Sequence, residues 1–201
     1  MYSEFRVCGS LYSASGQRKY VTFDERERFI AAALAWPQAN VRSFCLILAF
    51  TGCRISEALG LTEGSIIPKP GCIAFLSLKK RKKKAVVREV PVPPICISAI
   101  RAAHGPFTMP ERKLWTWSRC RAWQLVKLVM KQARIGPGIH ATPKGLRHGF
   151  GLHAVRSRIP LNLIQRWLGH ARMETTAIYL QAVGTEEREI ARRMWRNPNF
   201  P

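Results

Sequence analysis

A ten-residue run leaves one predicted helix almost without a polar face. Val41 to Phe50 reads VRSFCLILAF, and Thr51-Gly52 follows it directly. A helix that is apolar nearly all round must be covered by other elements, and a glycine just past its last residue is a common helix end. The run therefore predicts a buried helix, with RISEALGL forming another short helical piece after the turn.

Start and stop signals predict further helices on both sides of this run. Thr22 and Glu25 have the spacing of a capping box ahead of RERFIAAALAW, which Pro37 stops. Thr142-Pro143 supplies an N-cap and a proline at the first helical position of a later segment. After Pro93-Pro94 the helical segments are ICISAIRAAH, SRCRAWQLVKLVMKQARI, KGLRHGFGLHAVRS, LNLIQRWLG, METTAIYLQ and TEEREIARRMW.

Between the helices the hydrophobic period changes to that of strands. From Ile66 to Val92 the short runs SII, CIAFLSL and AVVREVPV are separated by Pro-rich and Lys-rich turns. The hairpin tip is KKRKKK, Lys79 to Lys84, which by itself is most simply a solvated turn. We therefore expect a mainly α fold with a small antiparallel β-sheet (α+β), preceded by a mobile N-terminal arm at residues 1–20.

Composition restricts the partners and the compartment. Thirty-three Lys and Arg against 12 Asp and Glu give a formal net charge of +21, so a compact fold repels itself unless an anion is nearby. Nucleic acid is the leading partner because its phosphates reward a basic surface through counterion release, although ribosomal or membrane-surface proteins can have the same charge. The six cysteines lack paired C-x-x-C spacing and are expected to be reduced thiols. With no signal peptide or membrane-spanning run, we expect a cytoplasmic protein that does not enter a membrane.

Several polar residues are suited to chemistry, yet each has an ordinary explanation. Arg54, after TGC, can simply extend to solvent. Lys144 and Arg147 share a helix face near an N-terminus that favours anions, which suggests a phosphate, although an exposed basic stripe is roughly twice as common. His170 is expected in a turn after a helix-ending glycine. Tyr179 lies on the next helix, where a lone tyrosine is a packing or surface residue in about ten cases to one.

Taken together and in order, these motifs resemble the tyrosine recombinase (phage integrase) family. The motifs are TGCRISEALGL, a lysine on a β-hairpin, KGLRHGF, and LGH followed by a tyrosine nine residues after the histidine. The resemblance runs from about Tyr20 to the C-terminus and implies the family's catalytic-domain fold for residues 21–201. Family members typically carry an N-terminal helical domain as well, but only about twenty residues precede the first predicted helix here. We therefore expect no separate N-terminal core-binding domain, as in the short recombinases that invert fimbrial promoters.

The resemblance also implies a catalytic set, namely Arg54, Lys79, Lys144, Arg147, His170 and Tyr179. Tyr179 would be the nucleophile, the two arginines and His170 would contact the phosphate oxygens, and a hairpin lysine would be the general acid. Lys80 remains an alternative to Lys79, because no glycines bracket the hairpin lysine. Lys144 stands where most members have a histidine, so a fixed cation replaces a proton acceptor. Glu57 stands where the family has an acidic residue that buttresses the site.

The implied function is site-specific DNA recombination through a 3′-phosphotyrosine intermediate, with no metal or cofactor. The implied partner is double-stranded DNA in the nucleoid, bound by a homo-tetramer together with an accessory DNA-bending protein. The segment TEEREIARRMW would dock on a neighbouring protomer or, equally well, on its own domain. Two alternatives stay open, a catalytically weak DNA-binding regulator of recombination sites and a type IB topoisomerase-like relaxase.

Overall fold

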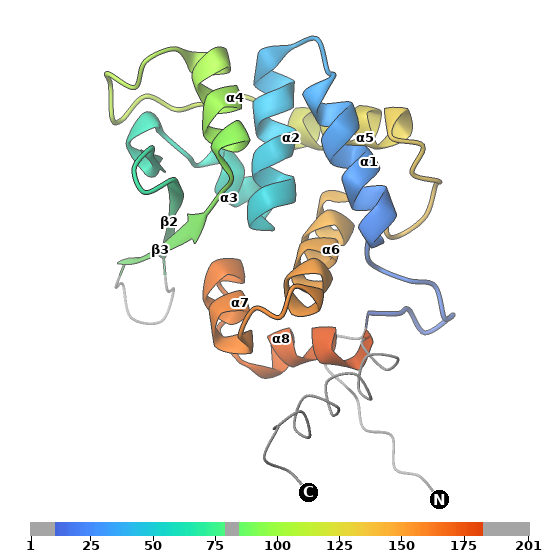
Figure 1. The fold of residues 1–201 in the computed structure, drawn as a ribbon. Coiled ribbons are helices and arrows are strands. Elements are labelled where there is room, and N and C mark those ends of the chain that lie inside the picture. Colours follow the sequence, from blue (N-terminus) through green and yellow to red (C-terminus); the bar gives the residue numbers. More distant parts are fainter. Residues whose placement is uncertain (1–10, 79–84, 183–201) are drawn as a thin grey trace, which may run out of the picture.

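The protein is mainly helical with one small sheet, in a computed structural model that describes residues 11–78 and 85–182 (Figure 1). This confirms the predicted fold class. None of the helices in these two ranges combines the length and hydropathy needed to cross a bilayer. The helical elements are α1 (Phe23–Leu34), α2 (Ala39–Thr51), α3 (Ile55–Leu59), η1 (Glu63–Ser65), α4 (Pro94–His104), α5 (Arg119–Gln132), α6 (Pro143–Arg156), α7 (Leu161–Leu168), α8 (Glu174–Ala177) and η2 (Ile178–Ala182).

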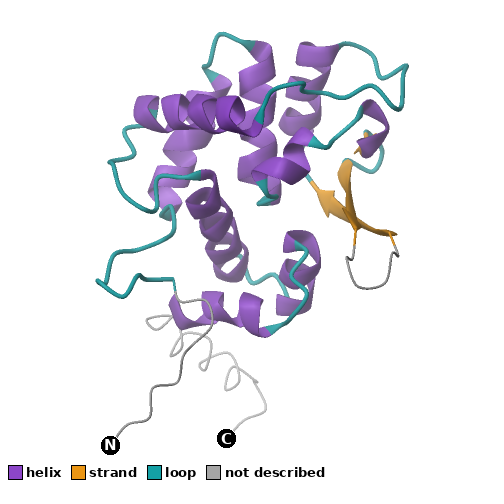
Figure 2. Cartoon of the chain, turned by 180° about the vertical axis from the view of Figure 1, so that it is seen from behind, coloured by secondary structure: helices purple, strands orange, loops and turns teal. Residues whose placement is uncertain are grey.

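Helix α2 lies at the centre of the larger hydrophobic core. Its residues from Phe44 to Ala49 are each at most 1% exposed, and α1, α4, α5 and α6 all contact it. Figures 1 and 2 show it enclosed by these helices from both sides. Gly52 ends the helix in the left-handed conformation, with φ 60°. The predicted burial of this run is therefore confirmed.

Local signals place the neighbouring helix ends. Thr22 Oγ1 accepts a hydrogen bond from the Glu25 N–H at 3.3 Å, and Glu25 Oε2 accepts one from the Thr22 N–H at 2.9 Å. These two bonds form the predicted capping box. Thr142 caps α6 in the same way, accepting from the Gly145 N–H at 3.1 Å. Helix α5 ends at Gln132, before the end of the predicted segment, and Arg134 rather than a glycine takes a left-handed φ of 54°.

The sheet has three antiparallel strands in the order β1 (Ile66–Ile67), β2 (Cys72–Leu78) and β3 (Ala85–Pro91). Two paired rows on one face, Ile73 with Val90 and Phe75 with Arg88, are buried. The pair Leu76 and Val87 on the other face is exposed. This alternation matches the predicted strands, and the hairpin tip, Lys79 to Lys84, lies outside the described residues.

A second, smaller core joins α6, α7 and η2, and α8 lies beside it in contact with α7 and η2. Its buried residues are Leu11, Phe150, Ala154, Ile164, Leu168, Ile178 and Tyr179. Figure 2 shows these elements on the side of the molecule away from α4 and α5. The METTAIYLQ segment is not one continuous α-helix as predicted, because α8 ends at Ala177 and Tyr179 lies in the 3-10 turn η2.

Residues 11–20, half of the predicted N-terminal arm, form a turn that packs on the domain. Tyr12 and Arg18 are joined by a β-bridge, and Leu11 is buried in the second core. Arg18 donates to both carboxylate oxygens of Glu25, at 2.6 and 2.5 Å. Within the described ranges, contacts with the domain therefore start ten residues before the predicted boundary. Residues 1–10 lie outside those ranges.

Replacing Gly52 tests how tightly α2 packs on the second core. A Cβ at Gly52 would lie 2.5 Å from Phe150 Cδ1 and 2.9 Å from Leu168 Cδ2, on a backbone with φ +60°. Left-handed strain of about 1–2 kcal/mol and overpacking of a similar size should together lower the free energy of unfolding of Gly52→Ala by about 3 kcal/mol. Urea titration measures this loss.

Gly16 is the matched control, because its φ is +74° and a Cβ added there would meet no other atom within 4 Å. Gly16→Ala should lose only the backbone contribution, about 1 kcal/mol. Equal losses in the two variants would contradict the packing argument.

Candidate active site

Three arginines from distant parts of the chain converge on the carboxylate of Glu57. Arg54 Nη1 lies 3.0 Å from Oε1, while Arg88 Nη2 and Arg147 Nη1 lie 2.9 and 3.9 Å from Oε2. The backbone N–H of Arg54 also donates to Oε2, at 2.7 Å. One side chain of α3 thus connects α3 with β3 and α6. Glu57, which stands where the family has a buttressing acidic residue, thus lies among the three arginines.

Arg147 is held by backbone carbonyls at the ends of two helices. It is 7% exposed, and its two terminal nitrogens donate to the carbonyls of Gly52 at 2.8 Å and Leu168 at 2.6 Å. Carbonyls at helix C-termini lack helical partners and carry partial negative charge. Burial lowers the pKa of Arg147 to about 10, with the charge of Arg54 acting in the same direction and that of Glu57 against it. Arg147 therefore remains a cation at neutral pH.

Arg88 belongs to the same cluster, although we did not predict it. Its Nε donates to the Trp167 carbonyl at 2.9 Å, and its guanidinium lies 4.7 Å from the centre of the Phe75 ring. The alternation of strand residues indicates its orientation. Arg88 is two residues from the apolar Val90 and so shares its face of the strand, which predicts that the side chain points inward. A buried arginine at such a position needs an acidic partner, and Glu57 is that partner.

The balance of charge keeps Glu57 ionised and leaves one arginine open to solvent. Burial acts to raise the pKa of Glu57, but the hydrogen bond from the Arg54 N–H and the charges of Arg88 and Arg54 outweigh it, so the pKa is lowered. The Arg54 side chain is 50% exposed, whereas that of Arg88 is 4% exposed and that of Arg147 8%. An anion that approaches from solvent therefore meets Arg54 first.

His170 lies in a turn beyond α7, as predicted. Gly169 ends α7 with φ 66°, and His170 Nδ1 lies 2.9 Å from Thr176 Oγ1. Burial, together with the charges of Arg147 and Arg54, lowers the pKa of His170 to about 3. The imidazole is therefore neutral at pH 7 and lies in the positive field of the arginine cluster.

Tyr179 is a fully buried member of the second core and also lies in this field. Its ring stacks on His170, with centroids 6.4 Å apart and an interplanar angle of 20°. It packs so closely on Gly151 that a Cβ there would lie 2.5 Å from Tyr179 Cζ. Burial raises the pKa of Tyr179 to about 12, while the charges of Arg147 and Arg54 act to lower it. The phenol is therefore protonated at neutral pH in the free protein.

The hydroxyl of Tyr179 bonds to a residue that we did not predict. His148 Nδ1 lies 3.2 Å from Tyr179 Oη. His148 follows Arg147 directly and lies one helical turn after Lys144, and this spacing was its only sequence signal. Lys144 itself is exposed near the start of α6, and its charge acts on His148 by lowering the pKa of that histidine.

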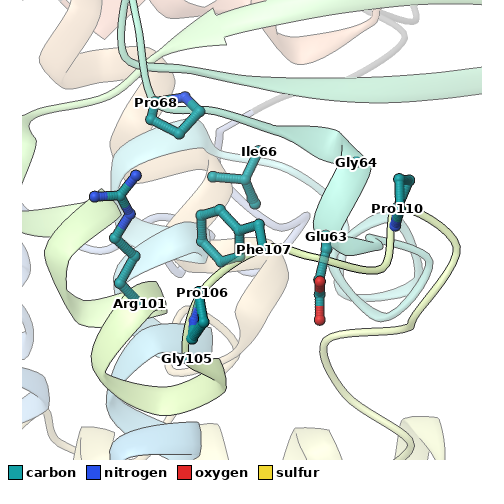
Figure 3. Close-up of a pocket in the computed structure, with 9 residues that line it drawn as sticks. All are labelled: Glu63, Gly64, Ile66, Pro68, Arg101, Gly105, Pro106, Phe107 and Pro110. Atoms are coloured by element: carbon teal, nitrogen blue, oxygen red, sulfur yellow. The ribbon is translucent and has the colours of Figure 1, made fainter.

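The structure therefore brings Arg54, Arg147, His170 and Tyr179 into one electrostatic environment. Lys144 lies at the edge of this group, and Lys79 and Lys80 lie outside the described residues. Across the described part of the chain, no three His, Cys, Asp or Glu side chains are grouped so that they could hold a metal ion. A pocket of about 740 Å³ lies beside Arg101 and Phe107 (Figure 3), and none of the predicted site residues in the described ranges lines it.

Comparison with known proteins assigns the family. Residues 19–185 match the phage integrase family. The tyrosine recombinase XerD of Neisseria meningitidis serogroup B is 32% identical over 168 residues, which cover 76% of this chain and 56% of that protein. The chain belongs to the phage integrase family, and the predicted resemblance is confirmed. It spans about half the length of the relatives it matches.

Solved structures agree on the fold. The crystal structure of XerA recombinase has a TM-score of 0.69 at 25% identity, covering 89% of this chain and 65% of that one. XerH site-specific recombinase, in a pre-cleavage complex with its difH substrate, has a TM-score of 0.68 at 20% identity, covering 90% and 59%. The described residues therefore have the tyrosine recombinase catalytic-domain fold.

Neutralising Glu57 tests whether its charge holds the arginines together. Glu57→Gln keeps the shape of the side chain but leaves Arg54, Arg88 and Arg147 facing one another without an anion. Breaking a fully buried ion pair costs about 3–5 kcal/mol and an exposed pair less than about 1. For this half-buried carboxylate we expect a loss of about 2 kcal/mol in urea titration, partly restored by sulfate.

Glu89→Gln is the control for this variant. Glu89 is exposed on the opposite face of β3 from Arg88, so its neutralisation should change stability by less than about 0.5 kcal/mol. A Glu57→Gln variant as stable as Glu89→Gln would show that the arginines do not need the carboxylate.

Proposed function

We propose that this chain is the catalytic portion of a site-specific DNA recombinase, which cleaves and rejoins strands through a 3′-phosphotyrosine link. The observation that carries the proposal is the gathering of Arg54, Arg147, His170 and Tyr179 within the fold of the phage integrase family. The relatives XerD and XerA, which are named recombinases, support it.

In the proposed cleavage step, Tyr179 Oη attacks the phosphorus of the DNA backbone. The Oη–P bond forms as the bond from phosphorus to the 5′ oxygen breaks. The tyrosine loses its proton, and the departing 5′ oxygen gains one from a general acid, for which we propose Lys79. The covalent link conserves the energy of the phosphodiester, so the strand can rejoin another end without ATP.

The arginine cluster is suited to stabilise the charge that develops in this step. Guanidinium groups are planar and permanently charged, and they can fork onto the nonbridging oxygens of the phosphate. Arg54 offers an exposed face to an incoming phosphate, while Arg147 is already fixed by two carbonyls. Because these donors are oriented before the substrate binds, little reorganisation is needed during the reaction. His170 would provide a further contact.

The proposed chemistry requires Tyr179 to become accessible. Its side chain is fully buried in the free protein, and it lies in η2, directly after the four-residue helix α8. A short α-helix followed by a 3-10 turn has few helical hydrogen bonds to lose. We propose that DNA binding moves this segment so that the hydroxyl reaches the phosphate beside Arg54.

Double-stranded DNA is the proposed partner because the net charge of +21 favours a dense polyanion. The solved XerH structure, which has the same fold, contains its difH substrate. We propose a homo-tetramer on DNA in the nucleoid, aided by an accessory DNA-bending protein. The segment TEEREIARRMW, proposed to join protomers, lies outside the described residues.

Binding to a DNA duplex should weaken steeply as salt rises. A protein that neutralises six to ten phosphates loses about 10³–10⁵-fold in affinity between about 50 and 200 mM salt, and fluorescence anisotropy at several salt concentrations measures this slope. Arg54→Gln should reduce the slope by about 1, the contribution of one phosphate contact. Arg101→Gln, beside the pocket of Figure 3, should leave it unchanged. A slope near zero for the unmodified protein would exclude binding through phosphates.

The covalent intermediate is the direct test of the proposed function. Nicked duplexes with randomised flanking sequence are incubated with the protein, and DNA that stays attached in denaturant is recovered and sequenced. We expect an adduct that Tyr179→Phe abolishes, because phenylalanine has no nucleophilic oxygen. Tyr12→Phe, at an exposed tyrosine, should leave it intact.

The other outcomes separate the competing functions. Binding without any adduct would favour a DNA-binding regulator. Relaxation of supercoiled DNA without strand exchange between two duplexes would favour a topoisomerase-like activity.

A further inference from the structure

We infer that His148 takes the proton from Tyr179 during strand cleavage, at a site where Lys144 stands in place of a histidine. This inference rests on the proposed phosphotyrosine chemistry. His148 would thereby be a catalytic residue in addition to the predicted set.

The contact between the two side chains carries the inference. His148 Nδ1 lies 3.2 Å from Tyr179 Oη, within hydrogen-bonding distance, and the rings are 6.0 Å apart and tilted by 60°. This geometry brings a ring nitrogen to the hydroxyl rather than the face of the ring. In residues 11–78 and 85–182, no other side chain is hydrogen-bonded to this hydroxyl. In the free protein His148 therefore already occupies the place that a general base needs, and the proposed movement of η2 toward the phosphate must preserve this contact.

The neighbouring groups are less suited to this task. The His170 ring lies nearly parallel to the tyrosine ring, and its Nδ1 is engaged with Thr176 Oγ1. The ammonium form of Lys144 has three donors and no acceptor. Lys144 is exposed, one turn of α6 before His148.

The electrostatic surroundings keep the imidazole of His148 ready to accept a proton. Burial, together with the charges of Lys144, Arg147 and Lys19, lowers the pKa of His148 to about 4. The imidazole is therefore neutral at pH 7. A DNA phosphate beside Arg54 and Arg147 would offset part of this positive charge and raise the pKa of His148. The base would become stronger when the substrate is bound.

The proton balance of the step is simple. The proton of Tyr179 Oη moves to His148 Nδ1 as the Oη–P bond forms, and the bond from phosphorus to the 5′ oxygen breaks. The 5′ oxygen takes its proton from the general acid. In the rejoining step each proton returns, so both groups end in their starting states.

The first test compares His148→Asn with the unmodified protein on DNA recovered from the adduct experiment. Asparagine can place an amide oxygen near the position of Nδ1, so it can keep the hydrogen bond but cannot take up a proton. We expect single-turnover cleavage at neutral pH to be about 10²–10⁴-fold slower. The rate of the variant should then rise about tenfold per pH unit, because cleavage would depend on tyrosinate formed in solution. His153→Asn, elsewhere on α6, should behave as the unmodified protein.

A substrate with sulfur in place of the 5′ bridging oxygen distinguishes loss of the general base from loss of the general acid. A thiolate leaves without a proton, so this substrate should rescue Lys79→Ala but not His148→Asn. A His148→Asn variant that cleaves at the unmodified rate or faster would overturn the inference. So would a slower variant whose pH profile runs parallel to that of the unmodified protein, because that result indicates only a structural role.

A second test needs no activity. Nitrogen-15 NMR of the free protein should show neutral His148 with its hydrogen on Nε2, which leaves Nδ1 as the acceptor. A hydrogen on Nδ1, or a charged ring at pH 7, would overturn the inference. Absence of any adduct with the unmodified protein would instead refute the proposed function and this inference with it. A full-rate adduct with His148→Asn would refute only the inference.

Discussion

The ion pairs of one half-buried carboxylate determine where the rest of the site can lie. Two unit charges 4 Å apart interact by about 4 kcal/mol at the effective dielectric of a protein surface, so Arg54, Arg88 and Arg147 cannot share a small volume without an anion between them. Glu57 provides that anion and contacts all three. Its own position follows from local structure, because it is the third residue of α3, where its side chain accepts from the Arg54 N–H before the helix. A helix-capping contact thus fixes the geometry of an arginine cluster assembled from three elements.

Tyr179 is both a packing residue and the proposed nucleophile, and these roles do not exclude each other. Its ring fills the second core against Gly151 and His170. The same burial raises the pKa of its hydroxyl to about 12, which keeps the phenol protonated and unreactive in the free protein. Activation of the phenol therefore depends on substrate binding, which must expose the hydroxyl and change the local charge. Such an arrangement links reactivity to the presence of DNA.

The elements of the fold were predictable because their signals are local. The capping box at Thr22, the apolar run of α2, Thr142-Pro143 and the strand alternation each act within a few residues, and all appear in the structure. The order of polar motifs was enough to indicate the family, whereas the catalytic roles assigned to those residues remain predictions. Arg88 and His148 were missed because their importance arises from contacts between β3 and α7 and between α6 and η2. The packing of residues 11–20 was missed for the same reason, since Arg18 is held by Glu25 and His140 rather than by a local pattern.

The helical geometry of α6 makes the replacement at position 144 understandable. Residues four apart on a helix lie on one face, about 5–6 Å from each other, so Lys144 and His148 are neighbours on the side of α6 that leads to Tyr179. A proton acceptor lost from one position can therefore be supplied one turn later without moving the backbone. In the inferred chemistry the lysine keeps an electrostatic role, because its charge lowers the pKa of His148 and keeps the ring neutral until a phosphate compensates. His148 and Lys144 then act as a pair, the first as proton acceptor and the second as cation. Because they lie one turn apart on α6, the basicity of His148 depends on how much of the nearby positive charge a bound phosphate offsets.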